Sequence, residues 1–409
     1  MSCALTMPCS GTLPYNGAMH ILHVTPYYRP AYAFGGVVRA LEGLAAAQVA
    51  RGLRVTVLTT DALTPTARYG GTLASDEDGV RVIRVRNLVY PLRRLNLSTP
   101  LGMRRAAHAL LGDVDIVHLH ELRTLEALLV TPQAARRGIP IALSPHGTLT
   151  TTTGRGALKR LWDRWLSLPV LMRLAAVAGL NADETAEAQR FCQLIISNHH
   201  QARIRFATIP NGIDAATYAH LDGRARFRAA WGLGDAPVVL FLGRLHARKG
   251  IDVLARAFMQ VGEGARLVIA GPDEGMLSTL RELAARDKRI IITGFLDGSA
   301  RLDALAAADV FALPATGEGL PMAALEAMAA GLPLLLSPGC HLPEAGDAGA
   351  AMIVEPQAAP LAEALSRLLA DDERRAEMGA AAQRLALERF SWASAAAAWE
   401  NLYEEIRGG

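Results

Sequence analysis

The sequence predicts an α/β protein built from two doubly wound parallel sheets that face each other across a cleft. Short β-branched segments alternate with longer helical patterns rich in alanine and leucine, which is typical of parallel sheets with crossover helices. This alternation starts again after Pro210. The length of 409 residues also exceeds what one hydrophobic core usually serves, so two domains of about 200 residues each are expected.

The predicted strands form two groups along the chain. The first group is His20–Thr25, Arg54–Thr60, Val80–Val85, Ile116–His120 and Ile141–Ser144. The second group is Val238–Leu242, Arg266–Ala270, Ile290–Thr293, Val310–Leu313 and Leu334–Leu336. Each group suffices for one doubly wound sheet, and ligands of such sheets bind outside the carboxyl ends of the strands.

The boundary between the domains is expected at Thr208–Gly212, where Asn-Gly after a proline marks a turn. It separates a first domain, residues 19–208, from a second domain, residues 209–390. Residues 1–18 lack the basic and apolar regions of a secretory signal, so we expect a disordered leader there. Residues 391–409 are expected to form a final helix.

Composition favours a globular enzyme in a reducing, cytoplasmic compartment. The chain is 51% hydrophobic and 20% charged, and its four cysteines show no paired spacing, so neither a disulfide framework nor a zinc site is indicated. A bilayer span needs roughly 18 uninterrupted apolar residues. Arg173 interrupts the best candidate, Leu166–Leu180, so no membrane span is predicted.

The charge is divided unevenly between the two halves. Residues 1–210 hold 23 basic and 13 acidic residues, whereas the rest holds 19 and 26. Val80–Arg105 contains seven arginines and no acid, and Arg155–Arg173 is basic with Trp162 and Trp165 interleaved. This pattern predicts an anionic partner such as a membrane surface, and no nucleic-acid partner is expected. A solvated helix face with aromatic core contacts explains Arg155–Arg173 equally well.

The segment Pro314–Gly331 carries the strongest chemical signal. It places Glu318 in a loop after a strand and Glu326 in the following helix. Pro321 suits the first helical turn, so the N–H groups of Met322–Ala324 are free to bind an anion such as a diphosphate. Glu318 can then accept hydroxyl hydrogen bonds from a hexose, and Glu326 those of a ribose. The alternative interpretation is a capped core helix with an acidic residue near its start.

The loop after the strand Val238–Leu242 offers two cations, Arg244 and Lys249. Loss of a nucleoside diphosphate builds negative charge on the departing phosphate, and fixed cations stabilise that charge in the transition state. Arginine can bind a phosphate through two hydrogen bonds, whereas lysine acts as a compact charge. Taken singly, each residue is equally well explained as an ordinary surface cation.

Two further candidates follow strands of the first domain. Gly35 and Gly36 open a helical pattern after the first strand, where backbone can approach a ligand closely. They lack the G-x-G-x-x-G spacing of a dinucleotide site, so an NAD-dependent oxidoreductase is not supported. His146 comes just after the strand Ile141–Ser144 and can hydrogen-bond a transferred sugar, although a lone histidine is more often structural.

No metal site is predicted. Asp113 and Asp115 form a D-x-D pattern, but it leads directly into an apolar strand, where such carboxylates are normally solvated. His118 and His120 share one face of that strand, and no third ligand follows at metal-binding spacing.

Together these segments resemble the retaining glycosyltransferases called glycosyl transferases group 1, or glycosyltransferase family 4, which have the GT-B fold of two Rossmann-like domains. The resemblance covers almost all of residues 19–409. It implies that the first domain binds the acceptor and that the second binds a nucleotide sugar. It further implies that the final helix, residues 391–409, packs back onto the first domain.

The family's motifs also imply roles for individual residues. The implied catalytic residues are His146, Arg244, Lys249 and Glu318. The residues implied to bind the donor are Gly35, Gly36, Phe295, Leu296, Gly319, Leu320, Met322, Ala323 and Glu326. Two segments depart from the family pattern, because Pro321 replaces a common glycine and Phe191–Phe206 is less alike.

The resemblance implies transfer of a hexose from a UDP- or GDP-sugar to an acceptor hydroxyl, with retention of configuration and without a metal or other cofactor. The basic first half further suggests a lipid-linked acceptor at the cytosolic membrane face, as in assembly of exopolysaccharide, capsule or lipopolysaccharide, with the protein bound there peripherally. Two alternatives stay open: a sugar-nucleotide epimerase of GT-B fold, and a sugar-nucleotide-binding protein without catalysis.

Overall fold

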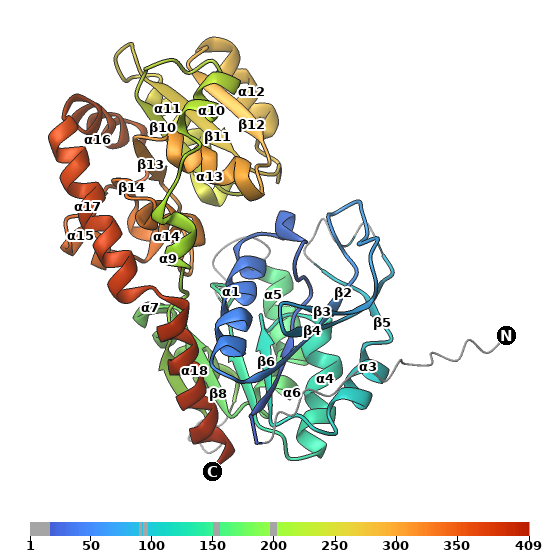
Figure 1. The fold of residues 1–409 in the computed structure, drawn as a ribbon. Coiled ribbons are helices and arrows are strands. Elements are labelled where there is room, and N and C mark those ends of the chain that lie inside the picture. Colours follow the sequence, from blue (N-terminus) through green and yellow to red (C-terminus); the bar gives the residue numbers. More distant parts are fainter. Residues whose placement is uncertain (1–16, 90–91, 93–96, 150–155, 197–202, 409) are drawn as a thin grey trace.

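The computed structural model describes residues 17–89, 92, 97–149, 156–196 and 203–408. Two α/β domains stack one above the other, joined by the chain near residue 210 and by the C-terminal helices (Figure 1). The expected leader, residues 1–18, lies outside the described residues apart from its last two. In the part of the chain that is described, no helix is both long and apolar enough to cross a bilayer.

The first domain is built on a mainly parallel sheet in the order β3-β4-β2-β1-β6-β7-β8-β9, with β5 paired to β4. Its strands are β1 His20–Val24, β2 Arg54–Thr60, β3 Ala74–Glu77, β4 Val80–Asn87, β5 Pro100–Leu101, β6 Ile116–His120, β7 Ile141–Ser144, β8 Ala176–Gly179 and β9 Arg205–Thr208. Only β3 and β5 run antiparallel to their neighbour, β4. β1 and β6 are buried along their whole length, as expected of central parallel strands.

Helices cover both faces of this sheet. They are η1 Tyr32–Phe34, α1 Gly36–Ala50, α3 Met103–Leu110, α4 Leu125–Arg136, α5 Gly156–Trp162, the π-helical turn Asp163–Ser167, α6 Leu168–Leu171 and α7 Ala182–Ile195. Thr124 caps α4 and Asn181 caps α7, because each side chain accepts a hydrogen bond from a first-turn N–H. One core lies beneath α3, α4, α6 and α7, and a second lies beneath α1.

The second domain has a wholly parallel sheet in the order β12-β11-β10-β13-β14-β15. Its strands are β10 Val238–Leu242, β11 Arg266–Ala270, β12 Ile290–Gly294, β13 Val310–Leu313, β14 Leu334–Leu336 and β15 Ala351–Ile353. Its shorter helices are α9 Ala215–Ala219, α10 Arg224–Ala230, η3 Ala247–Lys249, η4 Pro338–Cys340 and α15 Pro343–Asp347. Its longer helices are α11 Ile251–Phe258, α12 Leu277–Arg286, α13 Gly298–Ala307, α14 Met322–Ala329, α16 Ala358–Ala370 and α17 Asp372–Arg389.

The last helix, α18 Trp392–Arg407, returns to the first domain and lies along α1 (Figure 1). Ser391 caps it at the crossing point. A side chain at Gly43 or Gly212 would overlap Trp392, so glycine at these two positions permits the close approach. Tyr403 of α18 is fully buried in the core beneath α1.

The predicted α/β class and both parallel sheets are confirmed, and each predicted strand is present within two residues of its expected bounds. The prediction missed five strands: β3, β5, β8, β9 and β15. β8 has the sequence Ala-Val-Ala-Gly, which carries little β-branched signal, although all four residues are buried between β7 and β9. β3 and β5 are short edge strands, where sequence patterns are weakest.

Candidate active site

A pocket opens between the two domains, at the carboxyl ends of both sheets. Its walls come from the segments after β1, β7, β8, β9, β10, β11, β12 and β13 and from α14. All residues predicted for the site line it: His146, Arg244, Lys249, Glu318, Gly35, Gly36, Phe295, Leu296, Gly319, Leu320, Met322, Ala323 and Glu326. These residues are far apart in the sequence, so it is the two-sheet topology that brings them together.

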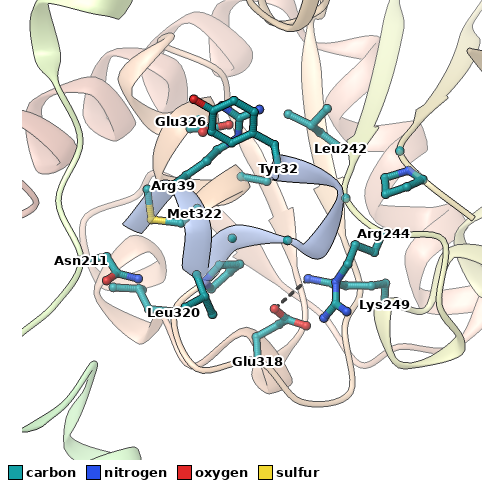
Figure 2. Close-up of a pocket in the computed structure, with 18 of the residues that line it drawn as sticks. Tyr32, Arg39, Asn211, Leu242, Arg244, Lys249, Glu318, Leu320, Met322 and Glu326 are labelled. Carbon is teal, nitrogen blue, oxygen red and sulfur yellow. Dashed lines mark ion pairs between the residues drawn. The ribbon is translucent and has the colours of Figure 1, made fainter. Parts of the chain in front are cut away.

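The two predicted cations lie in the loop after β10 and are each paired with a carboxylate. Lys249 Nζ lies 2.7 Å from a carboxylate oxygen of Glu318, the ion pair drawn in Figure 2. Arg244 Nη1 donates to both carboxylate oxygens of Glu274, at 2.8 and 3.0 Å. Both cations line the pocket (Figure 2), where an entering anion can take the place of either carboxylate.

Glycines shape the loop that carries these cations. A Cβ at Gly250 would overlap the backbone oxygen of Pro314, and one at Gly271 would overlap that of Gly243. Gly250 also has φ +64°, a left-handed conformation that side chains disfavour. The loop after β10 can therefore pack directly against the loops after β11 and β13, which places its cations beside Glu318.

Glu326 is the fifth residue of α14 and is buried, with 4% of its surface exposed. Its carboxylate forms an ion pair with Arg301 of α13, which also donates to the Tyr218 hydroxyl at 3.4 Å. The buried Nε of Arg301 has no hydrogen-bond partner among the described residues. Arg301 lines the pocket together with Glu326, although the sequence analysis did not select it.

The start of α14 differs in one respect from the expectation. Pro321 precedes the helix as its N-cap, and the Ala324 N–H donates to the Pro321 carbonyl at 2.9 Å. Of the three N–H groups expected to be free for an anion, that of Ala324 is therefore engaged. Met322 and Ala323, the first two residues of the helix, line the pocket.

The glycines of the first domain meet the second domain across the pocket. Gly35 has φ +111°, and a Cβ there would lie 3.1 Å from Arg244 Nε. A Cβ at Gly147, with φ +72°, would lie 2.9 Å from the backbone nitrogen of Gly319. The two domains approach each other backbone to backbone at this point, which only residues without side chains allow.

His146 follows β7 and has φ +54°, so the chain turns sharply beside the pocket. Its Nε2 lies 2.9 Å from Nδ1 of His120, at the end of β6. Burial lowers the pKa of His146 to about 4. The imidazole is therefore neutral near pH 7 and can act there as a hydrogen-bonding group rather than as a cation.

The sequence showed no third ligand at metal-binding spacing after His118 and His120, but the fold brings a third histidine, His23, beside them. His23 of β1 lies in register with His118, and ring nitrogens of the three histidines lie within 4.8 Å of one another. Both ring nitrogens of each histidine are already hydrogen-bonded, the outer partners being Gln48, Tyr403, Ser144 and His146. These hydrogen bonds account for all six ring nitrogens of the three histidines.

The D-x-D residues lie at the opposite end of the sheet from the pocket. Asp113 pairs with Arg54 at 2.6 Å, and Asp115 pairs with Arg407 of α18 at 2.9 Å. Both precede β6, whereas the pocket is lined by segments that follow strands. They therefore stabilise the fold and are not placed to contact a pocket ligand.

Sequence reasoning missed four residues of the first domain that line the pocket: Tyr32, Val37, Arg39 and Leu180. The guanidinium of Arg39 lies 4.3 Å from the centre of the Tyr32 ring and 2.6 Å from Asp297 in the loop after β12. This ion pair joins the two domains at one side of the pocket. The only sequence signal that could have indicated Arg39 is its place near the start of the helix that follows Gly35 and Gly36.

Comparison with known proteins agrees with this geometry. Residues 34–217 match the family model "Glycosyltransferase Family 4", and residues 236–371 match "Glycosyl transferases group 1". A D-inositol 3-phosphate glycosyltransferase from Xylanimonas cellulosilytica is 28% identical, over 97% of this chain and 98% of its own. A GDP-mannose-dependent alpha-(1-6)-phosphatidylinositol monomannoside mannosyltransferase from Mycolicibacterium smegmatis is 30% identical, over 69% and 75%.

Solved structures show the same architecture. Anabaena HepE, in complex with UDP and glucose, superimposes with a TM-score of 0.74 at 18% identity, over 95% of this chain and all of its own. At this identity the likeness establishes the fold, two Rossmann-like domains around a cleft. With both family models matched and both sheets in place, the chain belongs to the glycosyltransferases of group 1, family 4, and has the GT-B fold.

Proposed function

We propose that this glycosyltransferase transfers a hexose from a UDP- or GDP-sugar to an acceptor hydroxyl, with retention of configuration and without a metal. One observation carries the proposal: Arg244, Lys249 and Glu318 converge beside the start of α14 in a pocket between the two domains. Cations and a helix start suit a diphosphate, and a carboxylate suits sugar hydroxyls. The relatives named above act on GDP-mannose or on inositol phosphate, and HepE holds UDP.

In this proposal the diphosphate binds between the loop after β10 and the start of α14. Its negative charge displaces Glu318 from Lys249, which frees that carboxylate to accept hydrogen bonds from the hexose. Arg244 exchanges Glu274 for a phosphate oxygen in the same way. Glu326, held by Arg301 deeper in the pocket, accepts the ribose hydroxyls. The negative charges of the diphosphate thus meet the fixed positive charges of Arg244 and Lys249.

The chemical step is a substitution at the anomeric carbon on one face of the sugar. The bond from that carbon to the phosphate oxygen breaks, and a bond to the acceptor oxygen forms. The acceptor proton passes to an oxygen of the departing diphosphate. Arg244 and Lys249 stabilise the charge that develops on this leaving group, which is where fixed cations contribute most to the rate.

The test measures release of nucleoside diphosphate across a panel of UDP- and GDP-sugars, with and without EDTA. We expect release from one donor, unaffected by EDTA and increased by acceptor. Lys249→Ala should lower the rate by about a hundredfold, because it removes one of the cations at the leaving group. Lys288→Ala is the matched control, since Lys288 is exposed on the same domain and does not line the pocket.

Three outcomes would contradict parts of the proposal. Loss of activity in EDTA would overturn metal independence. Conversion of the donor to its epimer without a transferred product would favour an epimerase. Donor binding without turnover for every donor and acceptor would favour a binding protein.

We also propose that the acceptor is lipid-linked and is reached at the cytoplasmic face of a membrane. The support is the segment from α5 to α6, which exposes apolar side chains among cations. This Trp165 patch consists of Arg160, Leu161, Arg164, Trp165, Leu166, Met172 and Arg173. Trp165 is 66% exposed and Leu161 59%. Exposed tryptophan and leucine with arginines suit the interface of an anionic bilayer.

Contacts in two segments correct part of the charge argument. Arg84, one of the seven arginines of Val80–Arg105, is buried and paired with Glu77 at 2.7 Å. Asp163 is buried against Arg123 and does not offset the exposed cations nearby. The Trp165 patch therefore carries the membrane proposal better than the arginine-rich segment does.

Flotation with anionic vesicles tests this second proposal. Wild-type protein should float at low salt and dissociate as salt is raised. Trp165→Ser should weaken flotation, whereas Leu194→Ser should not, because Leu194 is an 86% exposed leucine on α7, outside the patch. Wild-type protein that stays unbound at low salt would count against a membrane-bound acceptor.

A further inference from the structure

A buried chain of hydrogen bonds runs from helix α1 to the histidine of the pocket. Nε2 of His23 lies 2.7 Å from Oε1 of Gln48, and Nδ1 of His23 lies 3.0 Å from Nε2 of His120. Nδ1 of His120 then lies 2.9 Å from Nε2 of His146. Gln48, His23 and His120 are each at most 1% exposed, so water does not compete for these bonds.

Each imidazole in the chain carries a single ring proton. Burial lowers the pKa of His23 and His146 to about 4 and the pKa of His120 well below its ordinary value. A neutral imidazole has one donor nitrogen and one acceptor nitrogen. The direction of one hydrogen bond in such a chain therefore determines the direction of all the others.

Gln48 determines that direction because both ends of its amide are engaged. Its Nε2 donates to the Tyr403 hydroxyl at 3.3 Å, which leaves Oε1 as the acceptor for His23. The Tyr403 hydroxyl in turn lies 2.7 Å from Nδ1 of His118, whose Nε2 lies 2.8 Å from the Ser144 hydroxyl. If Tyr403 donates to His118 and His118 donates from Nε2 to Ser144, the three bonds of this branch agree with that orientation of the amide.

The tautomers follow in order along the chain. His23 donates from Nε2 to Gln48 and accepts at Nδ1. His120 donates from Nε2 to His23 and accepts at Nδ1. His146 donates from Nε2 to His120, and its Nδ1 makes no hydrogen bond with any residue of the described chain.

We propose that Gln48, His23 and His120 are positioning residues that hold His146 in the Nε2–H tautomer, so that Nδ1 accepts a hydrogen bond from a hydroxyl of the donor sugar. This inference rests on the proposed function, in which His146 contacts the sugar. A histidine with the opposite tautomer would present an N–H at the same place. The sugar hydroxyl would then accept instead of donate, and its own proton would need a different acceptor in the pocket.

The last helix of the chain takes part in this arrangement through Tyr403. Gln48 belongs to α1 and Tyr403 to α18, and the two helices pack side by side. Docking of α18 on the first domain is therefore coupled to which ring nitrogen of His146, in the pocket, carries the proton. Neither residue touches the pocket itself.

The test is nitrogen NMR of protein labelled with ¹⁵N in its histidines, with the His146 signals assigned by their loss in His146→Ala. At pH 7 the wild-type protein should show His146 protonated on Nε2 only. Gln48→Met conserves the side-chain volume but removes the amide, so the Nε2 and Nδ1 shifts of His146 should move toward each other. Gln133→Met is the control, because Gln133 is a buried glutamine of α4 whose amide donates to the Leu129 carbonyl and takes no part in the chain.

Kinetics give a second readout. Gln48→Met should lower kcat/KM for the donor by up to about tenfold, whereas Gln133→Met should leave it unchanged. Protonation of His146 on Nδ1 in the wild type, or an unchanged His146 spectrum in Gln48→Met, would overturn the inference. If Gln48→Met does not fold, Tyr403→Phe provides the comparison, because it removes the partner that orients the amide.

The spectrum does not depend on turnover, so the two proposals can fail separately. The expected spectra with no donor turned over would leave the tautomer chain in place and overturn the proposed function. Donor turnover by a protein whose His146 is protonated on Nδ1 would overturn the tautomer proposal and leave the proposed function in place.

Discussion

Gly147→Ala tests whether the close approach of the two domains is required for transfer. Gly147 has φ +72°, where a residue other than glycine costs about 1 kcal/mol of stability. Its new Cβ would lie 2.9 Å from the backbone nitrogen of Gly319 in the other domain. Ordinary van der Waals contact begins about half an ångström farther out, so the domains must separate by that amount at the pocket. A misplacement of 1 Å can cost about a hundredfold in rate, which suggests about a tenfold loss here.

Gly138→Ala is the matched control for this experiment. Gly138 has φ +69°, lies in the same domain and has nothing within 4 Å of the position of a Cβ. Both variants should lose about 1 kcal/mol of unfolding free energy in urea denaturation. Only Gly147→Ala should lose kcat/KM, while calorimetry should find nucleoside diphosphate binding intact in both. Equal kcat/KM for the wild type and both variants would refute the reasoning.

Two more predictions address the carboxylates. Glu326→Ala should weaken nucleoside diphosphate binding by about tenfold or more, because buried Arg301 loses its partner and the ribose loses its acceptor. Glu318→Ala should chiefly lower kcat. Similar small effects of both variants on binding and on kcat would contradict the assigned roles. Burial raises the pKa of Glu126 to about 7 from an ordinary 4.5, so the stability that its protonated form provides is complete below pH 4.5 and is lost as pH rises through 7. Glu126→Gln should therefore be up to about 3 kcal/mol more stable than the wild type at pH 8 and equally stable near pH 4.5. If urea denaturation gives the same difference in unfolding free energy between variant and wild type at both pH values, the expected pH dependence is wrong.

The central strands could be read from the sequence because their signal is local. β6 and β10 are continuous runs of buried residues, and such runs are typical of parallel strands covered on both faces. β8 is equally buried, but its alanines and glycine are small because they lie under closely packed neighbours, and small residues do not distinguish strand from helix. Its position becomes evident only once β7 and β9 are placed beside it.

The candidate site could be predicted as a set of residues but not as a set of contacts. Glu318 and Glu326 belong to one segment, so their spacing along a loop and helix was readable. The pairing of Lys249 with Glu318 depends on how two separate βα-loops pack, and no spacing in the sequence encodes it. The same holds for Arg301, which reaches Glu326 from a different helix.

The histidine cluster shows the same limit in the first domain. Alternation along β6 placed His118 and His120 on one face, but His23 comes from β1, nearly a hundred residues earlier. Only the pairing of β1 with β6 reveals it, and only side-chain contacts show that every ring nitrogen of these three histidines is hydrogen-bonded.

The anomeric configuration of the first-formed product tests the central claim most directly. A donor of known α configuration, taken from those that release nucleoside diphosphate, is incubated with acceptor and EDTA, and the product is observed by proton NMR before any anomeric exchange. The account predicts an α-glycoside, because the acceptor attacks on the face that the diphosphate leaves. A β-glycoside, or no glycoside while the donor is consumed, would contradict it.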